Sequence, residues 1–274
     1  MVSSNPVPEA DHKSKRKTIE TIIFRFELQI LAFLYLLAFA AAEYITYYLS
    51  NVVGIIFYFS ILFCLIMNSV IDHDEARSKL WMALGLIPII RIVSLVIPTD
   101  LFPEIYSYAI IAAIILIVIF PLMRNLKLNF NDIGLNARKP VIQIFVGISG
   151  IGLGMIDYFI LRPKALNSQL PFSETIFPAL GLLVLIGFIE EMVFRGIMQK
   201  TARILLSWDW IYIVLIYSIM QIHQKSVLHC TFAFAVALFY GWIVKKTGSI
   251  LGVIISHSLL NISLFLMFPH ILKL

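Results

Sequence analysis

The sequence predicts an all-α fold, a polytopic membrane helical bundle of about eight to nine transmembrane helices. Composition is the first observation behind this prediction: 60% of the 274 residues are hydrophobic and 14% are charged, whereas soluble domains are roughly 45–50% apolar and about 25% charged. The second is patterning, because the charged residues are clustered and long apolar runs separate them. These runs are continuously apolar, which favours spanning helices over the alternating strands of a membrane β-barrel.

Nine of the runs approach the roughly 20 apolar residues that one helix needs to cross a bilayer. In chain order, the nine expected spans are 28–49, 52–71, 80–98, 105–123, 141–161, 176–203, 210–223, 228–244 and 249–268. The seventh and eighth are the shortest, so one of them could be tilted or partly re-entrant.

The placement of Lys and Arg predicts the orientation of these spans. With this topology, 15 of these residues fall on the side of the N-terminus and four on the opposite side. Because basic loops stay in the cytoplasm, we expect an integral, multi-pass protein of the cell (cytoplasmic) membrane whose N-terminus is cytoplasmic. The basic stretch 12–17 is typical of a flank that contacts anionic lipid. Membrane lipid is therefore an expected partner, and nucleic acid is not.

The same pattern divides the chain into four parts. Residues 1–27 form a basic cytoplasmic N-terminal tail, and residues 28–123 form N-terminal transmembrane helices with few chemical groups. Residues 124–140 form an amphipathic cytoplasmic connection. Residues 141–274 form the transmembrane core in which we expect the chemistry.

Several small or polar residues are expected to serve helix packing. Glu43 and Arg91 would pair with each other or with Asp157, or lie near an interface. His229 is expected to form a helix–helix hydrogen bond or to lie at an interface. The fifth span contains glycines, which let helices approach closely in lipid. They are Gly147, Gly150, Gly152 and Gly154.

The ionisable residues of the later spans are the strongest functional signal. Residues 190–195 read Glu-Glu-Met-Val-Phe-Arg within an apolar stretch, although a charged group at the bilayer centre costs about 2.5–3.5 kcal/mol on insertion scales. On a helix, Glu191 and Arg195 are four residues apart and can pair, whereas Glu190 is rotated by about 100°. Glu190 is therefore free to face a cavity, where a carboxylate can act as a general base.

Two imidazoles and an amide follow on later spans. His223 could share a proton with Glu190. His257 and Asn261 are four residues apart, so their polar groups point the same way, as stabilisation of an oxyanion requires. Together these groups predict a buried hydrolytic site. Zinc bound by Glu190, His223 and His257 beside a water is the chemical alternative, but the sequence has no His-Glu-x-x-His motif.

These motifs resemble those of the CPBP family (CAAX proteases and bacteriocin-processing proteins, also called the Abi family) of intramembrane glutamic endopeptidases. The family includes the type II CAAX prenyl endopeptidases. The resemblance rests on Glu-Glu-x-x-x-Arg at 190–195, on His223, and on His-x-x-x-Asn at 257–261, preceded by Lys-Thr-Gly-Ser-Ile-Leu at 246–251. It covers roughly residues 130–268. The family's middle motif is Phe-x-x-x-His, and Ile219 here replaces the phenylalanine, a departure that concerns the shape of the pocket.

The resemblance implies a role for each motif residue: Glu190 is the base that activates water, His223 assists it, His257 and Asn261 are the oxyanion pair, and Glu191 and Arg195 are a structural pair. The mechanism favoured for the family requires no metal or other cofactor, so none is expected here.

The expected function is therefore that of an intramembrane endopeptidase, in which glutamate and histidine activate water at a membrane-embedded site. Its expected partner is a peptide or protein substrate, with prenylated CAAX-type C-termini as one expected class. The alternative is a non-proteolytic membrane protein, such as a bacteriocin immunity or scaffolding factor, that uses the same cavity for binding. A transporter is a weaker alternative, because the hydropathy shows no inverted repeat.

Overall fold

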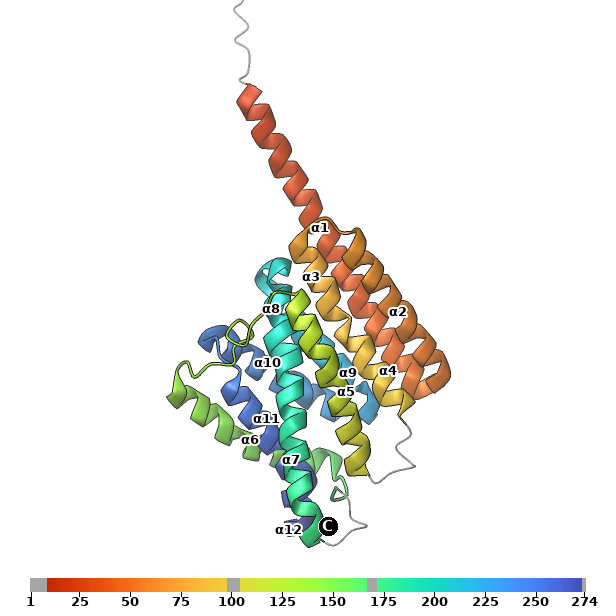
Figure 1. Ribbon diagram of the computed structural model, residues 1–274, viewed down its shortest axis with the longest axis vertical. Helices are drawn as coiled ribbons and strands as arrows, with labels where there is room; N and C mark the ends of the chain where they lie inside the picture. The colour runs from red at the N-terminus through yellow and green to blue at the C-terminus, as the bar shows by residue number, and fades with distance from the viewer. Residues whose placement is uncertain (1–8, 98–103, 167–171, 273–274) are drawn as a thin grey trace, which may run out of the picture.

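A computed structural model describes residues 9–97, 104–166 and 172–272, and most of these residues lie in helices (Figure 1). These ranges contain no strand, and eight of their helical segments are long and apolar enough to cross a membrane. The expected all-α polytopic bundle is confirmed. The elements of the first half are α1 (Glu9–Tyr44), η1 (Ile45–Leu49), α2 (Asn51–Ile71), α3 (Glu75–Leu84), α4 (Leu86–Val96) and α5 (Glu104–Asn125).

The second half of the chain holds the motifs. Its elements are α6 (Pro140–Leu161), α7 (Phe172–Glu191), η2 (Met192–Met198), α8 (Gln199–Thr201), η3 (Ala202–Trp208), α9 (Asp209–Met220), η4 (Gln221–Gln224), α10 (Val227–Thr247), α11 (Leu251–Ile262), η5 (Ser263–Met267) and α12 (Phe268–Leu272). Two of the η segments in this half, η2 and η5, are π-helical, and η3 and η4 are 3₁₀ turns.

The expected span 210–223 is the one that differs from the structure. It is formed by α9 and η4, of 12 and 4 residues, which together fall short of the roughly 20 residues of a full span. The segment formed by α9 and η4 runs antiparallel to α10. Near the start of α9, Trp210 lies against Gly241, and at its other end Gln221 lies 3.4 Å from His229. The short helix thus ends among the polar residues of its neighbours.

Close packing of α6 against α11 holds these two helices together. The two helices run in the same direction: Gly252 N donates to Gln143 Oε1 at 2.6 Å near their starts, and Gly154 meets Leu260 further on. A Cβ built on Gly150 would lie 2.0 Å from the carbonyl oxygen of Ser256. The expected role in close packing is therefore confirmed for Gly147, Gly150 and Gly154, and it is wrong for Gly152, where a Cβ would meet nothing within 4 Å.

We expect Gly150→Ala to destabilise the protein by about 1–3 kcal/mol, because the new methyl overlaps the backbone beside His257. The unfolding temperature in detergent measures this loss. Gly152→Ala is the matched control, since a Cβ there meets nothing within 4 Å and alanine favours the helix. Equal unfolding temperatures for the two variants would refute the packing explanation.

The helix α7 runs antiparallel to α11 and carries the acidic motif. Gly187 packs against Ser258, and Gly196 lies near Ile250 at the start of α11. The connection between α5 and α6 closes this end of the bundle, since Ile133 is buried and Ile250 N donates to the carbonyl of Gly134 at 2.9 Å.

Candidate active site

The acidic motif lies where α7 changes into a π-helix. Glu190 and Glu191 are the last two residues of α7, and η2 begins at Met192. Such π turns occur frequently at functional sites, and nothing in the residue pattern indicated this one. The two carboxylates face different surroundings, because the Glu191 side chain is 0% exposed and that of Glu190 is 36% exposed.

Glu191 joins two motifs. Its Oε2 faces Arg195 Nε at 3.3 Å, as the spacing predicted, and its Oε1 accepts a hydrogen bond from His257 Nδ1 at 2.7 Å. The second contact was not foreseen from the sequence. The guanidinium of Arg195 is further held over the ring of Tyr217, 4.5 Å from its centroid. One buried carboxylate thus ties α7 to α11.

His257 stands between the two carboxylates. Because Nδ1–H donates to Glu191, Nε2 is left facing Glu190, whose Oε2 lies 3.6 Å away. The rings of Tyr217 and Tyr240 lie beside the imidazole, with centroids 6.4 and 6.2 Å away. Asn261 lies one turn further along α11 and is 8% exposed. The imidazole is therefore fixed in position, with one nitrogen directed at Glu190.

A cavity of about 1100 Å³ runs between α4, α5, α6, α7, α9, α10 and α11. The four residues expected to carry the chemistry all line it: Glu190, His223, His257 and Asn261. Its walls also include apolar side chains of α5 and α7, among them Ile111, Ile115, Leu182 and Ile186. The cavity therefore combines a few polar groups with apolar walls, as ligand-binding cavities commonly do.

His223 lies on the cavity wall without touching Glu190. It belongs to the η4 turn, where its Nδ1 lies 2.8 Å from the carbonyl oxygen of Met220 and its Nε2 lies 3.0 Å from Gln224 Nε2. The imidazole in contact with Glu190 is that of His257. The proton sharing expected between Glu190 and His223 is therefore not a direct contact in this structure, because the η4 turn folds the ring back onto its own helix end.

A buried acid–imidazole pair also lines the cavity. Asp157 of α6 and His229 of α10 lie 2.8 Å apart, and the other ring nitrogen of His229 is 3.4 Å from Gln221. The helix–helix hydrogen bond expected of His229 is confirmed. Asp157 therefore does not pair with Arg91, which instead pairs with Glu43.

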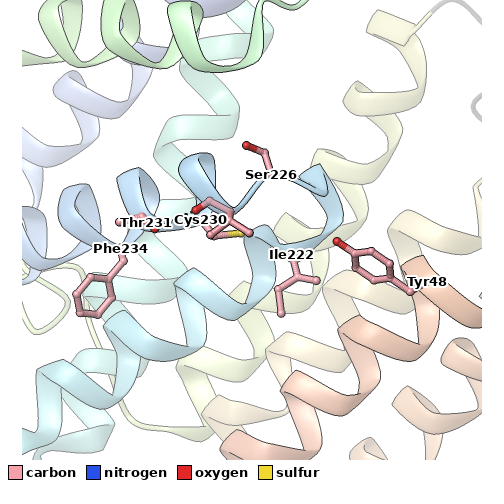
Figure 2. Close-up of a pocket in the computed structure, with 7 residues that line it drawn as sticks. Tyr48, Ile222, Ser226, Cys230, Thr231 and Phe234 are labelled. Carbon is pink, nitrogen blue, oxygen red and sulfur yellow. Dashed lines mark hydrogen bonds between the residues drawn. The ribbon is translucent and has the colours of Figure 1, made fainter.

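A second, smaller cavity of about 360 Å³ lies along η4 and the start of α10 (Figure 2). Its lining residues are Tyr48, Ile222, Ser226, Val227, Cys230, Thr231 and Phe234. Unlike the lining of the larger cavity, this lining contains no carboxylate or imidazole.

The described ranges contain no cluster of side chains that could bind zinc. No three His, Cys, Asp or Glu side chains gather there as a metal site, because His223 turns away from the Glu190–His257 contact. That the protein needs no metal stays a prediction, and adding a chelator to a cleavage assay would test it.

Residues 172–263 match a family model described as type II CAAX prenyl endopeptidase Rce1-like. This match supports an assignment to the CAAX protease family. Its range includes Glu190, His223, His257 and Asn261. No curated protein and no solved structure matched the chain.

The CAAX protease family supports an intramembrane endopeptidase in general terms, acting on a peptide or protein. Together with the eight apolar helices, the match supports an integral membrane protein. The family model does not extend to α1 through α6.

Proposed function

We propose that this protein is an endopeptidase that hydrolyses a peptide bond inside the membrane with a water molecule activated by Glu190. The observation that carries the proposal is the position of Glu190 in the segment matched by the family model. It is a partly exposed carboxylate on a cavity of about 1100 Å³, and His257 Nε2 lies 3.6 Å from it. A general base needs such access to water within a pocket that can hold the substrate.

The proposed reaction begins when Glu190 takes a proton from water and the hydroxide attacks the carbonyl carbon of the substrate. The oxyanion that forms accepts hydrogen bonds from His257, through Nε2–H of its protonated ring, and from the amide of Asn261. When the C–N bond breaks, Glu190 returns the proton to the leaving nitrogen. The buried Glu191–Arg195 pair supports this chemistry by holding His257 through Nδ1.

His223 acts from the other side of the same cavity. With Nδ1 bonded to its own helix end, Nε2 is the nitrogen available to water or substrate once Gln224 moves aside. In this proposal His223 orients water or a peptide group bound between the cavity walls, and assists Glu190 without contacting it.

The apolar walls favour a lipidated substrate. Side chains of α5 and α7 supply part of this apolar surface, and they line the same cavity as Glu190. A prenyl chain is an apolar group of suitable chemistry, and the family name points to prenylated CAAX sequences. We therefore propose a peptide with a prenylated C-terminal motif as the first substrate class to test.

The test compares the purified wild type with Glu190→Ala in detergent. Farnesylated CAAX peptides and their unmodified forms are incubated with each protein, with and without a chelator, and products are identified by mass spectrometry. We expect internal cleavage of the farnesylated peptides by the wild type alone, resistant to chelator. If the chelator abolished cleavage, the result would contradict the glutamate mechanism and favour a metal-dependent one.

A failure to cleave any peptide by a well-folded wild type would instead favour the non-proteolytic alternative. In that case the cavity binds a peptide or a membrane protein without hydrolysing it. Equal cleavage by Glu190→Ala would remove Glu190 from the mechanism.

A further inference from the structure

A buried ion pair from the N-terminal helices reaches the η4 turn that carries His223. Arg91 of α4 is 8% exposed and Glu43 of α1 is 0% exposed. Arg91 Nε donates to Glu43 Oε1, and the hydroxyl of Tyr58 on α2 donates to the same oxygen at 2.5 Å. Three helices outside the segment matched by the family model thus hold one guanidinium in place.

The other end of this guanidinium lies against the catalytic segment. Arg91 Nη2 donates to the carbonyl oxygen of Met220 and lies 3.4 Å from His223 Nδ1. The ring of Tyr47 packs on both groups, 5.8 Å from the guanidinium carbon of Arg91 and 5.8 Å from the ring of His223. The last turn of the α9–η4 segment is therefore fixed by side chains from α1, η1 and α4.

The shortest contact of His223 favours the tautomer with hydrogen on Nδ1. His223 Nδ1 lies 2.8 Å from the carbonyl oxygen of Met220, and two acceptors at that distance would repel each other, so Nδ1 is protonated. Nε2 then holds the lone pair in the neutral ring, and the amide nitrogen of Gln224, 3.0 Å away, donates to it. Arg91 and His223 thus share one carbonyl acceptor.

We infer that Arg91 is a positioning residue for His223: by binding the Met220 carbonyl it fixes the η4 turn and presents Nε2 of His223 to the cavity, while Glu43 fixes Arg91. The inference rests on the proposed function, since it concerns the reactivity of a residue in that site. It also gives the N-terminal half of the chain a part in the reaction. The planar fork of arginine suits this bridge, because it binds Glu43 and the carbonyl with different nitrogens.

The test uses Arg91→Gln in the full-length protein and the double variant Glu43→Gln/Arg91→Gln, which removes both charges of the pair together. Cleavage of a farnesylated CAAX peptide is measured as kcat and KM on folded protein. We expect kcat to fall about 10- to 100-fold with KM little changed, the size of effect that misplacement of a reacting group produces. Wild-type kcat in the double variant would overturn the inference while leaving the endopeptidase in place.

Tyr35→Phe is the matched control for a general loosening of the N-terminal helices. It removes the hydrogen bond that Tyr35 receives from Asn68, which joins α1 to α2 without contacting Arg91. This variant should keep the wild-type kcat. A loss of kcat as large as that of Arg91→Gln would show that packing alone explains the effect, and would overturn the inference.

A second readout is independent of activity. Nitrogen-15 NMR of histidine-labelled protein, with His223→Gln to assign the signal, reports which ring nitrogen of His223 is protonated. We expect the Nδ1–H form in the wild type and a mixture of the two tautomers in Arg91→Gln. If no peptide is cleaved, the proposed function fails and this measurement still decides the role of Arg91. An unchanged tautomer in Arg91→Gln would contradict it.

Discussion

Replacement of Glu190 by glutamine is expected to lower kcat for peptide cleavage by about 10²–10⁴-fold, the usual contribution of a general base. Glutamine keeps the size of the side chain and its place on the cavity, but it cannot take a proton from water. KM should change little, because the cavity walls that would bind the substrate are untouched. Initial rates over a range of farnesylated-peptide concentrations measure both constants.

Glu27→Gln is the matched control for this substitution. Glu27 is an exposed carboxylate on α1 and is not among the residues that line the cavity, so its amide variant should cleave at the wild-type rate. If Glu190→Gln retained wild-type kcat, the base would have to be another group. A large rise in KM at constant kcat would assign Glu190 to binding.

Loss of Glu191 should give the largest fall in stability. Glu191→Ala leaves Arg195 buried without its carboxylate partner, and breaking a buried pair in this way costs about 3–5 kcal/mol. The same change frees Nδ1 of His257, so hydrolysis should be lost as well. Unfolding temperature in detergent and the cleavage rate measure the two effects separately.

The double variant Glu191→Leu/Arg195→Met separates structure from chemistry. Because neither charge remains buried, its stability should return toward that of the wild type, whereas hydrolysis should stay low since His257 has lost its anchor. Glu75→Ala is the surface control: Glu75 and Lys79 have the same four-residue spacing on an exposed face, and its unfolding temperature should not shift. Recovery of activity in the double variant would contradict the link between Glu191 and His257.

Much of the fold could be predicted because a bilayer imposes simple rules. Long apolar runs must be helical where no water satisfies the backbone, so eight of the nine expected spans correspond to helices long enough to cross. The remaining expected span, 210–223, was already the shortest of the nine, and in the structure it is α9 followed by the η4 turn, which together are too short for a full crossing. Local pattern also gives no sign of the π-helix after Glu191.

One contact within the candidate site could be predicted from the sequence, and others could not. The four-residue spacing correctly indicated the contact between Glu191 and Arg195. The bond between Glu191 and His257 joins residues 66 positions apart, and no local periodicity reports such a pairing. Because charges buried in a membrane tend to pair, the sequence was sufficient to propose Glu43 and Arg91 as partners. The contact of Arg91 with His223 could not be predicted, because it depends on how α4 packs against the end of α9.

The most direct test of the account is a double-mutant cycle on Glu190 and His257. The values of kcat/KM are measured for the wild type, Glu190→Gln, His257→Gln and the double variant on one cleavable peptide. If the two residues act together on one hydrolytic step, each single change should remove nearly all activity and the double variant should be little worse than either. Two independent, multiplying losses, or wild-type activity in either single variant, would contradict the proposal that Glu190 and His257 form one catalytic centre.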